Sequence, residues 1–193
     1  MNDSNYYNKN AKAFYERTIH ANMQVRYDKF LSYLPKQAQI LDAGCEVGRD
    51  SKYFISQGYS ATAFDSSREM VKLAKAETGL NILQMTFQEM DFKDRFDGFW
   101  ASASLLHIPY NEMKNVLQKA RKALKLGGIF YASFKYGNSE RQIDDRCFFD
   151  LNEISALPYM DGLFEPIELW TTPDSGQSAS PDKLWLNILA KAK

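Results

Sequence analysis

The segment ILDAGCEVGRDSKYF, residues 40–54, constrains the fold more than any other part of the chain. It begins as a short apolar run, passes Gly44 and Gly48, and continues into a helical pattern. Glycines let the backbone approach a ligand closely, and the free N–H groups of a following helix attract an anion. The spacing Asp42-x-Gly44-x-Glu46-x-Gly48 differs from both the dinucleotide turn G-x-G-x-x-G and the P-loop. Small residues here can also serve strand–helix packing alone, so the turn by itself leaves both interpretations open.

Short apolar runs alternate with helical patterns along most of the chain. The first 35 residues carry apolar side chains at helical spacing, and Pro35 is expected to end that helical region. Beyond it, the pattern predicts strands at residues 39–43, 60–64, 81–85, 96–102 and 128–134. Strands that alternate with helices favour an α/β fold, in which helices cover both faces of a parallel sheet.

Cap and turn signals place the helices between these strands. Ser66 and Glu69 have the spacing of a capping box, in which each side chain accepts a free backbone N–H of the other residue at the start of a helix. Another helix is expected after Pro109, and Gly127-Gly128 is expected to terminate it.

The last third of the chain does not continue the alternation of strand and helix patterns. Residues 135–150 are charged and polar, which is typical of a solvated loop, and residues 151–157 have the pattern of a short helix. Two strand-like runs follow at 164–171 and 184–190, joined by the segment PDSGQS. They predict a C-terminal antiparallel hairpin with a mobile tip.

Composition narrows the choice of partners. Lys and Arg together number 24, as do Asp and Glu, so no global field attracts a nucleic acid or an anionic membrane. Cys45 and Cys147 are too few for a disulfide framework or a metal cluster. The polar start MNDSNYYNKN has no apolar signal region, and no apolar run approaches the roughly 20 residues of a membrane helix. We therefore expect a cytoplasmic monomer or homodimer with a small-molecule substrate and no metal, nucleic acid or membrane partner.

An acid at the end of the second predicted strand sharpens the interpretation of the glycine turn. Asp65 follows Asp42 by 23 positions, about where an acid must lie to bind the two hydroxyls of a ribose. Asp65 could instead cap a helix, but Ser66 or Ser67 is available for that role. The pair of features therefore predicts a nucleoside ligand.

Four segments carry a family resemblance when they are taken in order: ILDAGCEVGRD, ATAFDSSREMVKLAK, FDGFWASASLLHIP and LQKARKALKLGGIFYASF. Over about residues 5–190 the chain resembles the class I S-adenosylmethionine-dependent methyltransferases, within the group of tellurite-resistance and small-molecule methyltransferases. The resemblance implies a Rossmann-like, seven-stranded, mostly parallel sheet that ends in the antiparallel hairpin. It also implies S-adenosylmethionine as methyl donor, S-adenosylhomocysteine as product and a small-molecule acceptor. Residues 1–193 would form one domain, with 1–35 as a helical lid, 36–135 as the cofactor-binding core and 136–193 as the substrate-side loop and hairpin.

The resemblance assigns cofactor contacts to positions near the strand ends. Asp42, Gly44 and Gly48 would line the methionine end, and Asp65 would bind the ribose hydroxyls. Thr86 stands where the family often has an acid that meets the adenine amino group, although Glu89 offers another register. The expected cofactor-binding residues are Asp42, Gly44, Cys45, Glu46, Gly48, Asp65, Ser66, Met70, Thr86, Phe87 and Ser102.

The same resemblance points to a substrate side. His107 is the candidate catalytic residue, as a general base or substrate contact, although a histidine just before Pro109 can also simply cap the next helix. The expected substrate-side residues are Tyr7, Tyr15, Arg17, Ser104, Lys135, Tyr136 and Arg141. Aromatic residues at helical spacing also serve packing, and mixed charges also occur in solvated loops.

Glu46 departs from the glycine that the family usually has at this position. A non-glycine residue at positive φ costs about 1–2 kcal/mol. Repulsion between its carboxylate and the carboxylate of the cofactor at about 4 Å would cost roughly 4 kcal/mol at an effective dielectric of 20. Glu46 would therefore have to turn outward, toward Arg49 or Lys52, to leave a working site.

Two alternatives to a working methyltransferase remain open from the sequence. Glu46 could mark a degenerate methyltransferase-like module that binds or regulates a partner. A nicotinamide-dependent oxidoreductase would use a related sheet, but the chain lacks G-x-G-x-x-G. Because Asp42, Gly48 and Asp65 are all present, we favour a working site.

Overall fold

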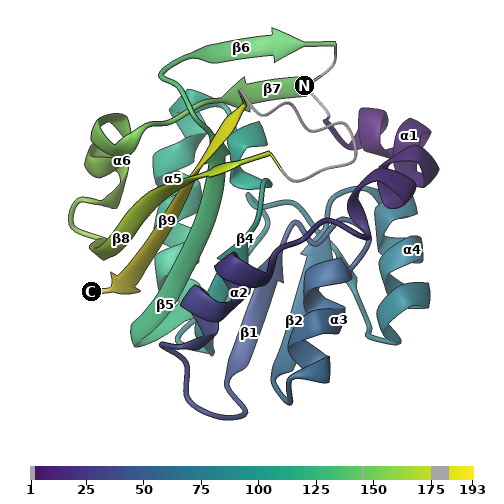
Figure 1. The fold of residues 1–193 in the computed structure, drawn as a ribbon, viewed down its shortest axis with the longest axis horizontal. Coiled ribbons are helices and arrows are strands. Elements are labelled where there is room, and N and C mark those ends of the chain that lie inside the picture. Colours follow the sequence, from purple (N-terminus) through teal and green to yellow (C-terminus); the bar gives the residue numbers. More distant parts are fainter. Residues whose placement is uncertain (1–2, 145, 175–182) are drawn as a thin grey trace.

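A single sheet organises the chain in the computed structural model, which describes residues 3–144, 146–174 and 183–193 (Figure 1). Within this described part, the spatial strand order is β3 (Leu83–Gln84), β2 (Ser60–Asp65), β1 (Gln39–Ala43), β4 (Phe96–Ala101), β5 (Leu124–Lys135), β9 (Leu184–Ala192) and β8 (Phe164–Pro173). The first five strands pair in parallel, whereas β9 pairs antiparallel with both β5 and β8. The predicted seven-stranded, mostly parallel sheet and its C-terminal hairpin are confirmed.

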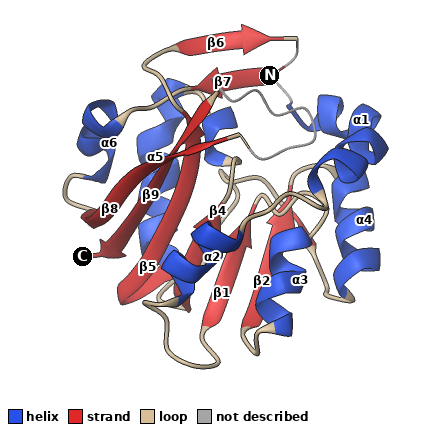
Figure 2. Cartoon of the chain, in the orientation of Figure 1, coloured by secondary structure: helices blue, strands red, loops and turns tan. Residues whose placement is uncertain are grey.

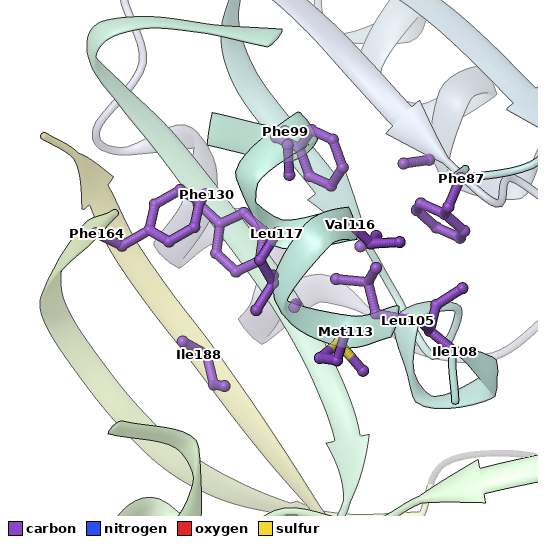
Figure 3. Packing of buried hydrophobic residues seen from close by; sticks show 14 of the residues in the cluster. Phe87, Phe99, Leu105, Ile108, Met113, Val116, Leu117, Phe130, Phe164 and Ile188 are labelled. Carbon is purple, nitrogen blue, oxygen red and sulfur yellow. The ribbon is translucent and has the colours of Figure 1, made fainter. Parts of the chain in front are cut away.

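Helices cover both faces of this sheet. The helical elements are α1 (Asp3–Thr18), α2 (Gln24–Leu31), α3 (Arg49–Ser56), α4 (Arg68–Thr78), η1 (Leu105–His107), α5 (Tyr110–Ala123) and α6 (Glu153–Met160). Phe30 of α2 and Phe54 of α3 pack with Trp100 on one face. Met113 and Val116 of α5 belong to the cluster on the other face, which is seen in Figure 3.

The two faces differ in the kind of side chain they bury. The α5 face is almost wholly apolar, and Phe130 stacks between Phe99, at a centroid distance of 5.6 Å, and Phe164, at 4.5 Å. On the α2 face the indole of Trp100 stacks on Tyr131 at 3.9 Å and donates to a carboxylate oxygen of Asp50 at 2.8 Å. The polar groups of the chain are therefore concentrated on the α2 face and at the strand ends.

A second hairpin stands over the carboxyl ends of the parallel strands (Figure 2). It consists of β6 (Glu140–Ile143) and β7 (Arg146–Phe149), which pair antiparallel. The expectation of a solvated loop over residues 135–150 is therefore wrong. The polar side chains of this segment hide the strand pattern because β7 buries only Phe148 and Phe149 against the core.

Two predicted helix boundaries are also wrong. The helix after Pro109 ends at Ala123, and Gly127-Gly128 lies within β5 instead of terminating the helix. A Cβ on Gly128 would lie 3.2 Å from the carbonyl oxygen of Asp97, so the glycine allows β5 to approach β4 where their register shifts. The predicted Ser66–Glu69 capping box is absent, because Ser67 caps α4 through the N–H of Met70 at 3.2 Å.

The remaining sequence expectations agree with the structure to within a few residues. The N-terminal region is helical in two pieces, α1 and α2, and the helix predicted over residues 151–157 is α6. Asn152 caps α6, which continues through Pro158. Residues 175–182, which include the predicted mobile tip of the terminal hairpin, lie outside the described residues. Across the described ranges, no helix is long and apolar enough to cross a membrane.

Candidate active site

Two adjoining cavities open at the carboxyl ends of β1, β2 and β4. The first cavity has a volume of about 550 Å³ and is lined by the glycine turn, the end of β2 and the β6–β7 hairpin. The second cavity, of about 360 Å³, is lined by α1, the end of β4 and the starts of α2 and β7. Tyr7, Glu46, Ala103 and His107 contribute to both cavities and form the boundary between them.

Both glycines of the turn are required by their surroundings. Gly44 has φ of 74°, and a Cβ there would lie 2.6 Å from the Cβ of Ser104. Gly48 has φ of 81°, and a Cβ there would lie 3.2 Å from the Cα of Ala74 on α4. Gly44 therefore faces the first cavity, whereas Gly48 allows α3 to pack closely on α4.

Asp65 holds the turn and also faces the first cavity. Its carboxylate accepts the backbone N–H of Glu46 at 3.0 Å and that of Ser67 at 2.8 Å. Burial raises the pKa of Asp65 to about 6, although these N–H groups oppose the shift. Ser66, Thr86 and Phe87 line the same cavity beside it, as does Gly44.

Glu46 lies at the boundary of the two cavities, and the charge of Arg49 at the start of α3 acts on it. It has φ of 47°, as expected for a residue that replaces glycine in this turn, and it lines both cavities. Burial and the neighbouring Asp65 raise the pKa of the Glu46 carboxyl to about 7, while Arg49 opposes the shift. The raised pKa means that Glu46 takes up a proton at a much higher pH than an ordinary glutamate does.

The partners expected for an outward Glu46 are engaged elsewhere. Arg49 donates to the carboxylate of Asp50 at 2.6 Å and to the carbonyl oxygen of Thr18 at 3.0 Å. Lys52 forms an ion pair with Glu77 at 2.6 Å. The expectation that Glu46 turns outward to either cation is therefore wrong, because both cations have a better-placed acid or carbonyl.

Tyr7 and His107 form a hydrogen-bonded pair at the boundary. The hydroxyl oxygen of Tyr7 is 2.7 Å from Nε2 of His107, and Nδ1 of His107 is 2.8 Å from the carbonyl oxygen of Cys147. A carbonyl only accepts, so Nδ1 carries the hydrogen and Nε2 accepts from the Tyr7 hydroxyl. Burial and the charges of Arg146 and Lys135 together lower the pKa of His107 to about 4, while the hydrogen bond to the carbonyl of Cys147 opposes the shift. The imidazole is therefore neutral at pH 7, with a basic nitrogen facing the cavities.

Most of the predicted site residues converge on these cavities. The predicted cofactor-binding residues on their walls are Gly44, Glu46, Asp65, Ser66, Thr86, Phe87 and Ser102. The predicted catalytic or substrate-side residues on their walls are Tyr7, Arg17, Ser104, Lys135, His107 and Arg141. The hydroxyl of Ser104 donates to the carbonyl oxygen of Ala43 at 2.7 Å, so Ser104 also fixes the end of β1.

Three predicted cofactor residues besides Gly48 lie behind the cavity walls. The carboxyl of Asp42 accepts the hydroxyl of Ser51 at 2.6 Å, and burial together with the charge of Asp50 raises the pKa of Asp42 to about 8. Cys45 and Met70 are buried in apolar clusters against α4 and α1. The positions of these side chains therefore do not support direct contact with a ligand, because other residues of the protein pack against them.

Two predicted substrate-side tyrosines also lie away from the cavities. The hydroxyl of Tyr15 donates to Glu77 on α4 at 3.0 Å. The hydroxyl of Tyr136 donates to Glu153 on α6 at 3.0 Å, and 43% of the Tyr136 surface is exposed. Neither phenol lines a cavity in this structure, because each is held by an acid elsewhere.

The sequence analysis missed several residues on the wall of the second cavity. They are Arg26, Arg49, Arg146, Lys183 and Trp185. Arg146 belongs to the segment interpreted as a loop, and its position depends on the β6–β7 hairpin. Arg26 carried a usable signal, because a cation on the otherwise apolar face of a helix is unusual.

The described part of the chain was also searched for groups of side chains that could bind a metal ion. No group of three or more His, Cys, Asp or Glu side chains could hold a metal ion there.

Sequence comparisons find similarity to methyltransferases. Residues 40–128 match the family model described as "Methyltransferase domain". Two relatives named ubiquinone biosynthesis O-methyltransferase, from Xanthomonas axonopodis pv. citri and Xylella fastidiosa, are each 26% identical over 126 residues. The aligned region covers 61% of this chain and 52% and 50% of the two relatives, so the chain spans about half the length of the curated relatives it matches.

Solved structures show the same fold over nearly the whole chain. The 1,6-didemethyltoxoflavin-N1-methyltransferase of Burkholderia thailandensis, which was solved with 1,6-didemethyltoxoflavin and S-adenosylhomocysteine bound, is 21% identical, with a TM-score of 0.79. The match covers 99% of this chain and 86% of that one. A TehB-like S-adenosylmethionine-dependent methyltransferase from Corynebacterium glutamicum is 16% identical with a TM-score of 0.70, and the match covers 99% and 98% of the two chains. The resemblance to class I S-adenosylmethionine-dependent methyltransferases is thus confirmed at the level of fold.

Proposed function

We propose that this protein transfers a methyl group from S-adenosylmethionine to a small-molecule acceptor. The observation that carries the proposal is the arrangement of Gly44 and Asp65 on the wall of one cavity, at the carboxyl ends of neighbouring parallel strands. Ligands of doubly wound sheets bind at this edge, and an acid at the end of the second strand is placed to accept ribose hydroxyls. The matches to methyltransferases support the same donor.

The residues of the first cavity suit this cofactor. A volume of about 550 Å³ is within the range of small-molecule sites. Gly44 lines the cavity without a side chain of its own, so a ligand can approach the backbone of the turn there. When bound, the cofactor supplies a methyl group on a positively charged sulfur. We assign direct cofactor contacts to the wall residues Gly44, Glu46, Asp65, Ser66, Thr86, Phe87 and Ser102.

The predicted residues behind the wall support the cofactor site indirectly. Asp42 anchors α3 through Ser51, and Gly48 lets α3 approach α4. Cys45 and Met70 fill the space beneath the turn and α1. In this proposal α1 is the lid, because it brings Tyr7 to the boundary of the cavities.

Tyr7 and His107 provide the proton acceptor. Nε2 of His107 faces the boundary as a base, and Nδ1 is fixed by the carbonyl oxygen of Cys147 at 2.8 Å. An acceptor hydroxyl that replaces the Tyr7 hydroxyl at Nε2 would lose its proton to the imidazole as it is methylated. The names of the curated O-methyltransferase relatives favour such an oxygen acceptor. The chain's other contributions are to position the reactants and exclude water.

The neutral form of Glu46 reconciles an acid at this position with cofactor binding. With a pKa raised to about 7, the carboxyl takes up a proton at neutral pH at little cost. A protonated side chain does not repel the carboxylate of the cofactor and can donate a hydrogen bond to it. Glu46 therefore makes the site pH-sensitive without abolishing it.

Calorimetry with S-adenosylhomocysteine tests the proposal. We expect saturable binding at pH 6.5, and no binding of NAD under the same conditions. Absence of heat with millimolar S-adenosylhomocysteine would refute the proposed function, and saturable binding of NAD instead would indicate an oxidoreductase.

A further inference from the structure

We propose that the methyl acceptor carries an acidic group, a carboxylate or a phosphate, which binds between Lys135 and Arg146 in the second cavity. The identification of this acid as the methyl acceptor rests on the proposed function. The acid-binding site itself is inferred from the charges on this wall.

Cations dominate the wall of the second cavity. Its basic side chains are Arg17, Arg26, Arg49, Lys135, Arg146 and Lys183. The carboxylates on the described part of this wall are Glu46 and Asp174. A cleft lined by one sign of charge attracts a ligand of the opposite sign.

Two of these arginines are already engaged in structural roles. Arg26 donates to the side chain of Asn187 at 3.1 Å and to the hydroxyl of Thr172 at 2.6 Å, which fixes α2 to the β8–β9 hairpin. Arg49 is paired with Asp50 at 2.6 Å. Arg17 lies over the ring of Phe14, with its Cζ 4.1 Å from the centroid. The charge available to a ligand is therefore sought among the remaining cations, Lys135, Arg146 and Lys183.

Lys135 and Arg146 supply that charge. Both lie against the ring of Phe148, with Lys135 Nζ at 4.2 Å and Arg146 Cζ at 5.0 Å from its centroid. Among the described residues Lys135 forms no ion pair, and Arg146 is paired with Asp144 at 3.8 Å, a residue with 65% of its side chain exposed. Arg146 also lies over the ring of Tyr6, with Cζ 3.8 Å from the centroid. Nε of Arg146 is buried without a hydrogen-bond acceptor. Arg141 lies against the Phe148 ring as well, at 5.0 Å, but it is paired with Asp150. Of the three cations on the Phe148 ring, Lys135 and Arg146 therefore have the weaker ion pairing among the described residues.

The neighbouring positive charges affect the pKa of Lys135. Burial lowers the pKa of Lys135, and the charges of Arg141, Arg146 and Lys183 lower it further, against the opposing charge of Asp150. Asp150 is already bound by Arg141 through both carboxylate oxygens, at 2.8 and 3.0 Å. An anion between Lys135 and Arg146 would relieve this repulsion and form charge-assisted hydrogen bonds.

The rest of the wall indicates the shape of the acid. Phe14, Met23, Leu106 and Trp185 give the second cavity an apolar side, and its volume is about 360 Å³. A compact acid with a flat apolar part, such as an aromatic acid, fits both halves of the wall.

Calorimetry with three small probes tests the site directly. We expect benzoate or phenyl phosphate to bind the wild-type protein at constant ionic strength, and the neutral analogue benzamide to bind at least about tenfold more weakly. Whichever of the two acids binds more tightly shows whether the site prefers a carboxylate or a phosphate. Equal affinity for benzoate and benzamide, or no binding of either acid, overturns the inference.

Variants locate the binding. Lys135→Met and Arg146→Met are each expected to weaken binding of the preferred acid by about tenfold, whereas Lys135→Arg retains it. Lys114→Met, which removes an exposed cation from α5, is the matched control and should bind as the wild type does. Unchanged acid affinity in both Met variants places the acid elsewhere and overturns the inference.

The histidine at the boundary gives an independent readout. Because the charges of Arg146 and Lys135 help to lower the pKa of His107, a bound acid should raise it, as followed by the imidazole proton shifts in NMR. The exposed His20 serves as the internal reference. An unchanged pKa of His107 at saturating benzoate contradicts the site.

The outcomes separate this inference from the proposed function. Binding of S-adenosylhomocysteine without selective acid binding refutes the acid site alone. Selective acid binding without binding of S-adenosylhomocysteine refutes methyl transfer and leaves an acid-binding site.

Discussion

The two cavities differ most in the sign of their charge. On the described wall of the first cavity, Glu46, Asp65, Glu112 and Glu140 face a single cation, Arg141. The wall of the second cavity has the opposite balance, with Lys and Arg in excess. The field therefore changes sign across the boundary formed by Tyr7 and His107.

The difference teaches how a small domain can keep two reactants apart. In the proposed reaction, the positively charged donor would be favoured on the acidic side and the anionic acceptor on the basic side, so each reactant would be repelled from the other's cavity. Exclusion of this kind contributes to specificity as much as attraction does. It also explains why a chain of balanced overall charge can present strong local fields.

The largest expected effect comes from removing the base at the boundary. With an acidic hydroxyl compound that supports turnover, His107→Gln should lower kcat by about 10²- to 10⁴-fold, because the acceptor loses its proton acceptor. Affinity for S-adenosylhomocysteine should stay within about twofold. Steady-state kinetics and calorimetry on one preparation check both points. An unchanged kcat would leave His107 as a structural residue that holds Tyr7 and β7.

The next effect is a pH optimum of cofactor affinity. Binding needs ionised Asp65, whose pKa is raised to about 6, and neutral Glu46, whose pKa is raised to about 7. Affinity for S-adenosylhomocysteine should therefore be greatest between these values and fall roughly tenfold per pH unit above the second. Calorimetry from about pH 5.5 to 8.5 measures the profile.

Replacement of Glu46 separates the two limbs of this profile. Glu46→Gln should abolish the fall in affinity at high pH and keep the fall at low pH, because Asp65 is unchanged. Tighter binding as the pH rises in the wild type would mean that the Glu46 carboxylate attracts the cofactor's amino group, which contradicts the repulsion argument.

A smaller effect is expected from the ribose-binding acid. Asp65→Asn should weaken S-adenosylhomocysteine by about tenfold at pH 7.5, because an amide has one accepting oxygen in place of two. The matched control Asp161→Asn changes an exposed acid beyond the end of α6 and should have no effect. Equal affinity of the two variants would remove Asp65 from the cofactor site.

The smallest effect tests the correction of Tyr15. Its hydroxyl is bound to Glu77 on the outer surface, so Tyr15→Phe should leave the affinities for S-adenosylhomocysteine and for benzoate within about twofold of the wild type. A large loss of either affinity would show that the phenol turns inward when a ligand binds.

The fold was predictable because its signals are local. Strands such as Gln39–Ala43 and Phe96–Ala101 are short, mostly apolar and mostly buried, as is typical of a sheet covered on both faces. Asp65 was predictable for the same reason, since it directly follows such a run. Gly127-Gly128 was misassigned because a glycine pair has the same local pattern at a helix end and at a strand irregularity.

The charge separation was not predictable from local patterns. Lys135, Arg146 and Lys183 come together only after β5, the β6–β7 hairpin and β9 have folded against one another. The surroundings of Glu46 likewise depend on other ion pairs. Arg49 is paired with Asp50, and Lys52 is paired with Glu77. Such pairings depend on distances between residues that are far apart in the sequence, and these distances are known only from the structure.

The hydrogen bond between Tyr7 and His107 also has a consequence in time. In the proposed reaction the acceptor replaces the Tyr7 hydroxyl at Nε2 of His107 and approaches the methyl group to about 3–3.5 Å, so the Tyr7 ring would leave the boundary in every cycle. Rotations of side chains and movements of chain termini take about picoseconds to microseconds, whereas a typical enzyme turns over in about 0.1 s. The Tyr7 ring could thus open and close many thousands of times between two reactions, and its resting contact with His107 sets the fraction of time for which the passage is closed.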